Sequence, residues 1–233
     1  MDQQRGIAES VKQSIVGTVR GTGEIVNAVT ETVTGSLSQA LRGAGNVGQA
    51  LTGAVSDVAR GVIRGTQEVG GDLGAAAKGA VIGTLRGTKE AGGAAIDTVG
   101  TTVENLVSTT AEVGGDIGNA ARQAVEGTLL GAKSVGINAL DAAGAAAGGA
   151  VKAASQAGSD VGTAAKSAVE GAISAAKDLG VDASEAASAA ATGALQAAGD
   201  IGGEALEQTK RAATGVISGV KVVASEPFRK KKS

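Results

Sequence analysis

Apolar and charged residues recur along this chain with a period of eleven. From Ala8 to Pro227 the sequence divides into twenty rows of eleven residues, without an insertion or deletion. Columns one, four, seven, eight and eleven hold Val, Ile, Leu, Ala, Thr or Gly almost throughout, and every charge falls in columns two, five, six, nine or ten. Eleven residues make three helical turns at about 3.67 residues per turn. The apolar columns therefore form one stripe of a helix, opposite a charged face.

This pattern predicts an all-α fold, because the adjacent apolar columns seven and eight break the alternation of a strand. Nearly all of Ala8–Val223 is expected to be helical, with no β-strand. We expect a long amphipathic helix or helices, packed side by side like a right-handed coiled coil. One unbroken helix would span about 330 Å, and a hairpin or several bends would shorten it. The domains are a polar leader at 1–7, the repeats at 8–227 and a basic tail at 228–233.

The eleven-residue rows are grouped into longer repeats. An Arg-Gly pair recurs every 22 residues, beginning at Arg20, Arg42, Arg64 and Arg86. Closely similar segments of 44 residues begin at Asp72, Asp116 and Asp160. Fixed periods of this length are the signature of a repeat architecture.

Glycine is the main objection to a long helix, because each of the 39 glycines costs about 1 kcal/mol relative to alanine. One series lies in column eight, within the apolar stripe: Gly48, Gly70, Gly92, Gly114, Gly136, Gly158, Gly180 and Gly202. We interpret it as a site of close helix packing, with valines of the intervening rows filling the notches: Val81, Val103, Val125 and Val169. A second series lies on the polar side, where descent from a duplicated unit is an equal alternative: Gly61, Gly83, Gly127, Gly149, Gly171, Gly193 and Gly215.

The charges give the helix one basic and one acidic flank. The basic flank, in column five, includes Lys78, Lys89, Arg122, Lys133, Lys166 and Lys177. The acidic flank, in columns six and ten, includes Asp72, Glu90, Asp116, Asp160 and Asp178. Opposite flanks meet when identical helices lie parallel, so parallel neighbours are favoured, although each exposed pair contributes only about 0–1 kcal/mol.

Composition excludes several classes of function. The chain has one Phe and no Trp, Tyr, His or Cys, so a compact core of large side chains is not expected, and disulfides and thiolate metal sites are excluded. We expect no catalytic, cofactor-binding or metal-binding residue. The net charge of −2 does not favour electrostatic binding to nucleic acid. We see neither a secretory signal nor an apolar run long enough to span a membrane, which favours a cytoplasmic or membrane-peripheral location.

The repeats resemble several families in period and composition. Arg64–Gly71 and Arg86–Gly93 look like the eleven-residue repeats of the synucleins. The doubling to 22 residues is similar to exchangeable apolipoproteins, and the register to perilipin-type droplet coats, hendecad coiled coils and some late embryogenesis abundant proteins. These resemblances imply lipid-surface binding, self-assembly or desiccation protection. The chain departs from them, because it lacks the prolines and aromatics of apolipoproteins and has one acidic edge.

Our first hypothesis is a non-enzymatic structural protein whose helices assemble side by side into a parallel homo-oligomer, with or without a lipid surface. The glycine series and the two flanks favour it. The first alternative is a coat that binds membranes, lipid droplets or granules through the apolar stripe. The second alternative is a desiccation-protective repeat protein.

Overall fold

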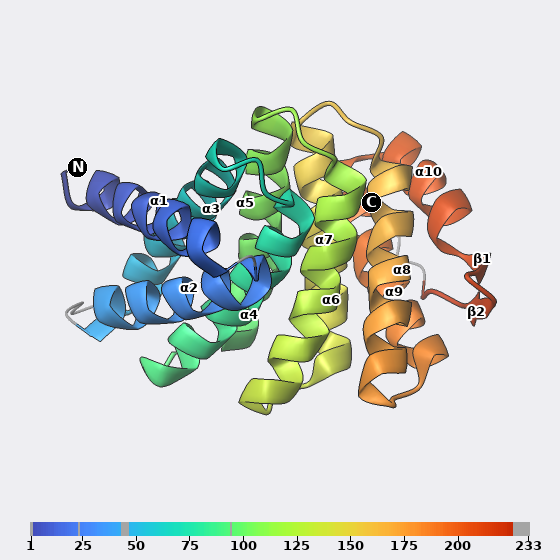
Figure 1. The fold of residues 1–233 in the computed structure, drawn as a ribbon. Coiled ribbons are helices and arrows are strands. Elements are labelled where there is room, and N and C mark those ends of the chain that lie inside the picture. The colour runs from blue at the N-terminus through green and yellow to red at the C-terminus, as the bar shows by residue number, and fades with distance from the viewer. Residues whose placement is uncertain (1, 23, 43–46, 94, 226–233) are drawn as a thin grey trace.

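The computed structural model describes residues 2–22, 24–42, 47–93 and 95–225, and it shows ten α-helices, a short 3-10 helix and a β-hairpin in these ranges (Figure 1). The bounds are α1 Asp2–Thr22, α2 Ile25–Arg42, α3 Val47–Glu68, α4 Leu73–Glu90, η1 Ala95–Thr98, α5 Val99–Glu112, α6 Ile117–Val135, α7 Ala139–Gln156, α8 Val161–Leu179, α9 Ala183–Ile201, α10 Gly203–Ala213, β1 Gly215–Ile217 and β2 Val220–Val222. The expectation of a mostly helical chain is confirmed.

Most of the central helices end and restart through the same short sequence. At the end of α3, Gly70 has φ of +68°. Its amide donates to the Gln67 carbonyl at 3.0 Å, and the Gly71 amide donates to the Thr66 carbonyl at 2.9 Å. This pair of bonds is a Schellman motif, which satisfies the last carbonyls of a helix and favours glycine in the left-handed conformation.

The N-cap of the next helix lies two residues after that glycine. The Asp72 carboxylate accepts hydrogen bonds from the amides of Gly74 at 2.7 Å and Ala75 at 3.1 Å, and so caps the N-terminus of α4. The same succession of a left-handed glycine, one residue and a capping side chain occurs at Gly114 with Asp116, Gly136 with Asn138, Gly158 with Asp160, and Gly180 with Asp182. The 22-residue unit is therefore one helix with its own start and stop.

The helices form two layers within one chain. The odd layer contains α1, α3, α5, α7 and α9, and the even layer contains α2, α4, α6, α8 and α10, because each helix packs mainly against the next but one. Neighbours within a layer are parallel, since successive positions of α4 follow successive positions of α2 in the same order: Gly79 on Val26, Gly83 on Thr30 and Gly87 on Thr34. The helix axes turn progressively along the stack (Figure 1). This is the arrangement of a helical repeat protein.

One of the larger apolar side chains of each unit is buried at an equivalent position. These side chains recur every 22 residues, and each is at most 5% exposed: Leu41, Ile63, Leu85, Val107, Leu129, Val151, Ile173, Leu195 and Ile217. Val81, Val103, Val125 and Val169 are fully buried beside them. Most of the remaining core is alanine. The expectation that too few large side chains would leave a compact interior poorly filled is corrected, because closely approaching helices leave only spaces that small side chains fill.

Two further expectations are corrected. The hendecad register does not run through one long helix or a coiled coil, because the glycine-based turns divide it every second row. The chain also contains an antiparallel hairpin, in which Gly215 pairs with Val222 and Ile217 with Val220. Branched residues favour the extended backbone here, and Ser218 and Gly219 provide the turn with positive φ.

Asp57 on α3 is expected to make stability depend on pH. It is 7% exposed, its Oδ2 has no hydrogen-bond partner, and Arg60 lies 3.7 Å from Oδ1. Burial raises the pKa of this carboxyl, and Arg60 opposes the rise only in part. Above the raised folded-state pKa, the carboxyl of Asp57 is charged and its burial lowers the free energy of unfolding. As the pH falls through that pKa, the carboxyl is protonated and this loss of stability disappears.

Asp57→Asn should therefore raise the free energy of unfolding at pH 7 by about 1 kcal/mol, the lower end of the cost of an unsatisfied buried group. The gain over the parent should shrink as the pH falls toward the ordinary aspartate range. Urea unfolding across this pH range measures it. Glu31→Gln, at an exposed position of α2, is the control and should change little. A gain for Asp57→Asn that is independent of pH would contradict the prediction.

Candidate functional site

The column-eight glycines do not pack helices together. Gly70, Gly92, Gly114, Gly158 and Gly180 have positive φ at helix ends, and a Cβ on any of them would meet nothing within 4 Å. Gly136 is similar, with only the Lys89 ammonium 3.9 Å from such a Cβ. Gly202, with φ of +154°, separates α9 from α10. Gly48 lies in α3, and its surroundings are outside the described residues. The helix-packing interpretation is corrected: in the described members, glycine provides the turn.

The second glycine series takes the packing role instead. A Cβ on Gly171 of α8 would lie 2.2 Å from the Arg122 carbonyl oxygen of α6, and one on Gly193 of α9 would lie 2.0 Å from that of Gly144 on α7. Four more members would likewise come within 2.7 Å of a carbonyl oxygen of the neighbouring helix: Gly61, Gly83, Gly127 and Gly149. Backbone contact of this kind requires glycine. Gly215 is the exception, because it lies in β1.

The acidic flank is mainly a set of helix caps. The carboxylates of Asp72, Asp116 and Asp160 accept hydrogen bonds from the first amides of α4, α6 and α8. Glu90 and Asp178 are exposed near the C-terminal ends of α4 and α8. The acidic flank therefore stabilises individual helices more than it stabilises contacts between helices.

The basic flank does reach across to parallel neighbours, but within the same chain. Lys78 of α4 binds Glu126 of α6 at 2.5 Å. The ammonium groups of Lys89 and Lys133 donate to the last carbonyls of the next helix in the layer, at Val135 and Leu179. Such cations stabilise helix C-termini.

The other three basic residues remain on the surface. Lys166 lies 3.9 Å from Glu170 on its own helix, and Arg122 and Lys177 are exposed. Parallel pairing of unlike charges, which the sequence favoured, is thus found between helices of one molecule.

A groove crosses the outer face of the odd layer over α5, α7 and α9. It has a volume of about 690 Å³. Its base is backbone, because five of the lining residues are glycines: Gly100, Gly144, Gly148, Gly149 and Gly193. Two contacts explain why the groove forms here: a Cβ on Gly149 would lie 2.3 Å from the Gly100 carbonyl oxygen, and Gly193 meets Gly144 as described above. The helices approach closely and no side chains fill the space above them.

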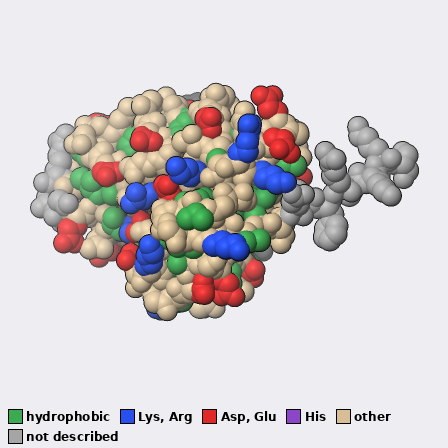
Figure 2. Space-filling view, turned by 90° about the vertical axis from the view of Figure 1, so that its right-hand side faces the viewer, with side chains coloured by type: hydrophobic (Ala, Val, Ile, Leu, Met, Phe, Trp, Pro, Cys, Tyr) green, Lys and Arg blue, Asp and Glu red, His purple; other side chains and the backbone are tan. Residues whose placement is uncertain are grey.

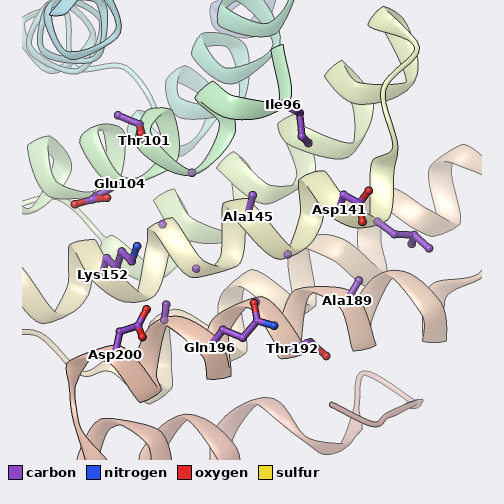
Figure 3. A pocket seen from close by; sticks show the side chains of 17 residues that line it. Ile96, Thr101, Glu104, Asp141, Ala145, Lys152, Ala189, Thr192, Gln196 and Asp200 are labelled. Atoms are coloured by element: carbon purple, nitrogen blue, oxygen red, sulfur yellow. The ribbon is translucent and has the colours of Figure 1, made fainter. Parts of the chain in front are cut away.

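Charged and polar side chains line the groove from all three helices (Figure 3). Glu104 comes from α5, Asp141 and Lys152 from α7, and Asp200 from α9. Lys152 lies between Glu104 and Asp200 in this view. Glu104 accepts a hydrogen bond from Gln156 at 2.7 Å. Among the described residues, Lys152, Asp141 and Asp200 have no ion pair. The groove therefore presents one ammonium and three carboxylates, of which Glu104 is already hydrogen-bonded to Gln156.

The eleven-residue columns do not predict this groove, because its charged residues come from column nine of one row and columns two and six of others. The available signal is the concentration of glycine at Gly144, Gly148 and Gly149. Within the described ranges, we find no cluster of acidic residues with metal-ligand geometry.

The helices were also tested for membrane spans. No helix in the described part of the chain is both long and hydrophobic enough to cross a bilayer.

Comparisons with known proteins give likenesses to solved structures alone. No protein-family model matches the chain, and no curated protein matches it. Among solved structures, the crystal structure of the de novo designed helical repeat protein DHR7 is similar at 22% identity, over 73% of this chain and 95% of that chain, with a TM-score of 0.39. The assignment of this chain as a helical repeat protein therefore comes from its own packing, in which 22-residue units stack in two layers.

Proposed function

We propose that this chain is a non-enzymatic helical-repeat scaffold whose groove binds an extended, basic peptide segment. The observation that carries the proposal is that three helices each direct a carboxylate to one groove: Glu104, Asp141 and Asp200. Stacked helical repeats form extended surfaces on which such segments bind. The volume of about 690 Å³ lies within the range of ligand sites in proteins.

The lining favours a positively charged ligand over a neutral or acidic one. Lys152 is the single cation among the lining residues, so the groove carries an excess of two negative charges. Carboxylates that face solvent attract Lys and Arg side chains and raise the rate of encounter. The glycine base leaves room for a peptide backbone to approach closely.

The contacts that the sequence suggested for self-assembly occur within one chain. The packing glycines and the Lys78–Glu126 pair act between helices of one chain. The end of the molecule that carries α9 and α10 shows interspersed Lys, Arg, Asp and Glu side chains, with hydrophobic side chains in small separate patches (Figure 2).

A lipid coat likewise gains little support, since binding to a lipid surface scales with apolar area. The exposed large hydrophobic side chains of the described surface are Val181, Ile201, Val216 and Val223. They lie in a turn, at a helix end, and in and beside the hairpin, so they do not form a helical stripe.

Fluorescently labelled octalysine is a suitable probe of the groove. We expect it to bind the full chain at low ionic strength, with binding weakened about tenfold by Glu104→Gln, Asp141→Asn and Asp200→Asn together, equivalent to about 1.4 kcal/mol. Lys152→Gln should strengthen binding, because it removes the one like charge from the groove. Fluorescence anisotropy measures both effects.

A second triple variant controls for net charge. Glu31→Gln, Glu90→Gln and Asp178→Asn remove the same number of charges from exposed positions on α2, α4 and α8. This variant should bind octalysine nearly as well as the parent. Equal losses in both triple variants would show that the probe senses only overall charge, and the proposal would fail.

A further inference from the structure

The segment after the hairpin follows α9 toward the groove. The Ser184 hydroxyl donates to the Lys221 carbonyl at 2.7 Å, the Val223 amide donates to the Ser188 hydroxyl at 3.2 Å, and the Ser225 amide donates to the Thr192 hydroxyl at 3.1 Å. Thr192 is itself a lining residue of the groove. The described chain thus ends against the edge of the proposed binding site.

These three contacts define a register. Every second residue of the segment meets every fourth residue of α9. Two residues of extended chain advance about 6.6 Å, and four residues of helix advance about 6 Å, so the two repeats stay matched for several steps. Gln196 and Asp200 are the next residues of α9 at this spacing, and both line the groove. If the register continued beyond Ser225, positions 227 and 229 would fall beside them.

We propose that the chain's own segment 226–233 continues along α9 in this register and occupies the acidic end of the groove, as an internal competitor for the basic peptides that the proposed function assigns to it. In this register Arg229 would lie beside Asp200 and would be followed by Lys230, Lys231 and Lys232. Glu104 lies at the same end of the groove as Asp200 (Figure 3). The consequence for regulation rests on the proposed function, whereas docking of the segment can be tested separately.

The sequence of the segment suits this path. Pro227 fixes its own φ near −65°, and it biases Glu226 toward extended backbone. Pro227 also lacks an amide hydrogen, so at this step the register needs no hydroxyl acceptor, and α9 provides Gln196 there instead of Ser or Thr. Four consecutive basic residues follow Phe228, which gives the segment a charge opposite to that of the groove.

A spin label tests the docking directly. Since the chain contains no cysteine, Ser233→Cys gives a single labelling site on the full chain. With a nitroxide there, we expect strong broadening of amide resonances of residues 192–200 on α9 and of neighbouring positions around Lys152. Replacing Arg229, Lys230, Lys231 and Lys232 by Gln should abolish the localised broadening. A mixture of isotope-labelled chain without nitroxide and unlabelled chain with it should show none, because the contact is within one molecule.

Octalysine binding then separates this inference from the proposed function. If both hold, the four-Gln variant binds octalysine at least tenfold more tightly than the parent, because the internal competitor is removed. If broadening is absent or spread evenly while octalysine still binds through the groove carboxylates, the inference is overturned and the function stands. If the broadening is localised but neither chain binds octalysine, the segment docks and the proposed function fails.

Discussion

Gly171→Ala is expected to destabilise the protein by about 3 kcal/mol or more, at the upper end of the cost of overpacking. The added methyl group would lie 2.2 Å from the Arg122 carbonyl oxygen, so α6 and α8 would have to move apart. Separating them also opens the core around Ile173 and Leu129, which are buried between the layers. Urea unfolding followed by circular dichroism measures the loss.

A matched substitution tests whether the position of a glycine decides if its replacement by alanine stabilises or destabilises the protein. Gly35 also lies within a helix, α2, but a Cβ there would meet nothing within 4 Å. Gly35→Ala should therefore stabilise the protein by about 1 kcal/mol, the intrinsic difference between the two residues in a helix. A Gly171→Ala variant as stable as the parent would contradict the packing role.

Lys78→Met should lower the free energy of unfolding by about 3 kcal/mol, because it leaves a buried charge unpaired. The Lys78 ammonium lies 2.5 Å from Glu126, and the two side chains are 20% and 8% exposed. Replacing both residues by Met should recover most of the loss, since hydrophobic side chains of similar volume can substitute for a buried pair.

The exposed pair of Lys166 and Glu170 provides the comparison. Their atoms are 3.9 Å apart and the side chains are 57% and 32% exposed. Lys166→Met should change the free energy of unfolding by less than about 1 kcal/mol. Similar losses for Lys78→Met and Lys166→Met would mean that burial does not set the importance of the Lys78–Glu126 pair.

The helical nature of the chain could be predicted from the eleven-residue period, because that period follows directly from the geometry of the helix. The division into short helices had a signal as well. A glycine followed two residues later by Asp or Asn recurs at each 22-residue step from Gly114 to Gly180, as at Gly158 and Asp160. This is a helix stop followed by a start. The eleven-residue period does not reveal these turns, because turns of constant length preserve the register.

The roles of the two glycine series could not be separated from the sequence. Gly114 and Gly127 both recur at 22-residue intervals, yet one is a turn and the other contacts the Lys78 backbone. Column position suggested the reverse assignment, because the apolar stripe was drawn for a continuous helix. The charge flanks could not tell whether a parallel neighbour belongs to the same chain, as it does for Lys78 and Glu126.

The groove depends on which helices lie next to one another, so the local pattern could not predict it. Glu104, Asp141 and Asp200 line one groove only because α7 lies between α5 and α9. The segment beside Thr192 likewise depends on the hairpin, whose branched residues had been included in the helical repeats.

Small-angle X-ray scattering of the dilute protein, with its mass in the same sample, tests the central claim that parallel helices pair within one chain. A compact chain of 233 residues has a radius of gyration of about 18 Å. We predict a value within a few ångströms of that, at a mass of 22.1 kDa and with helix content independent of concentration. A radius of many tens of ångströms, as for an extended rod, or helix content lost on dilution, would contradict the claim.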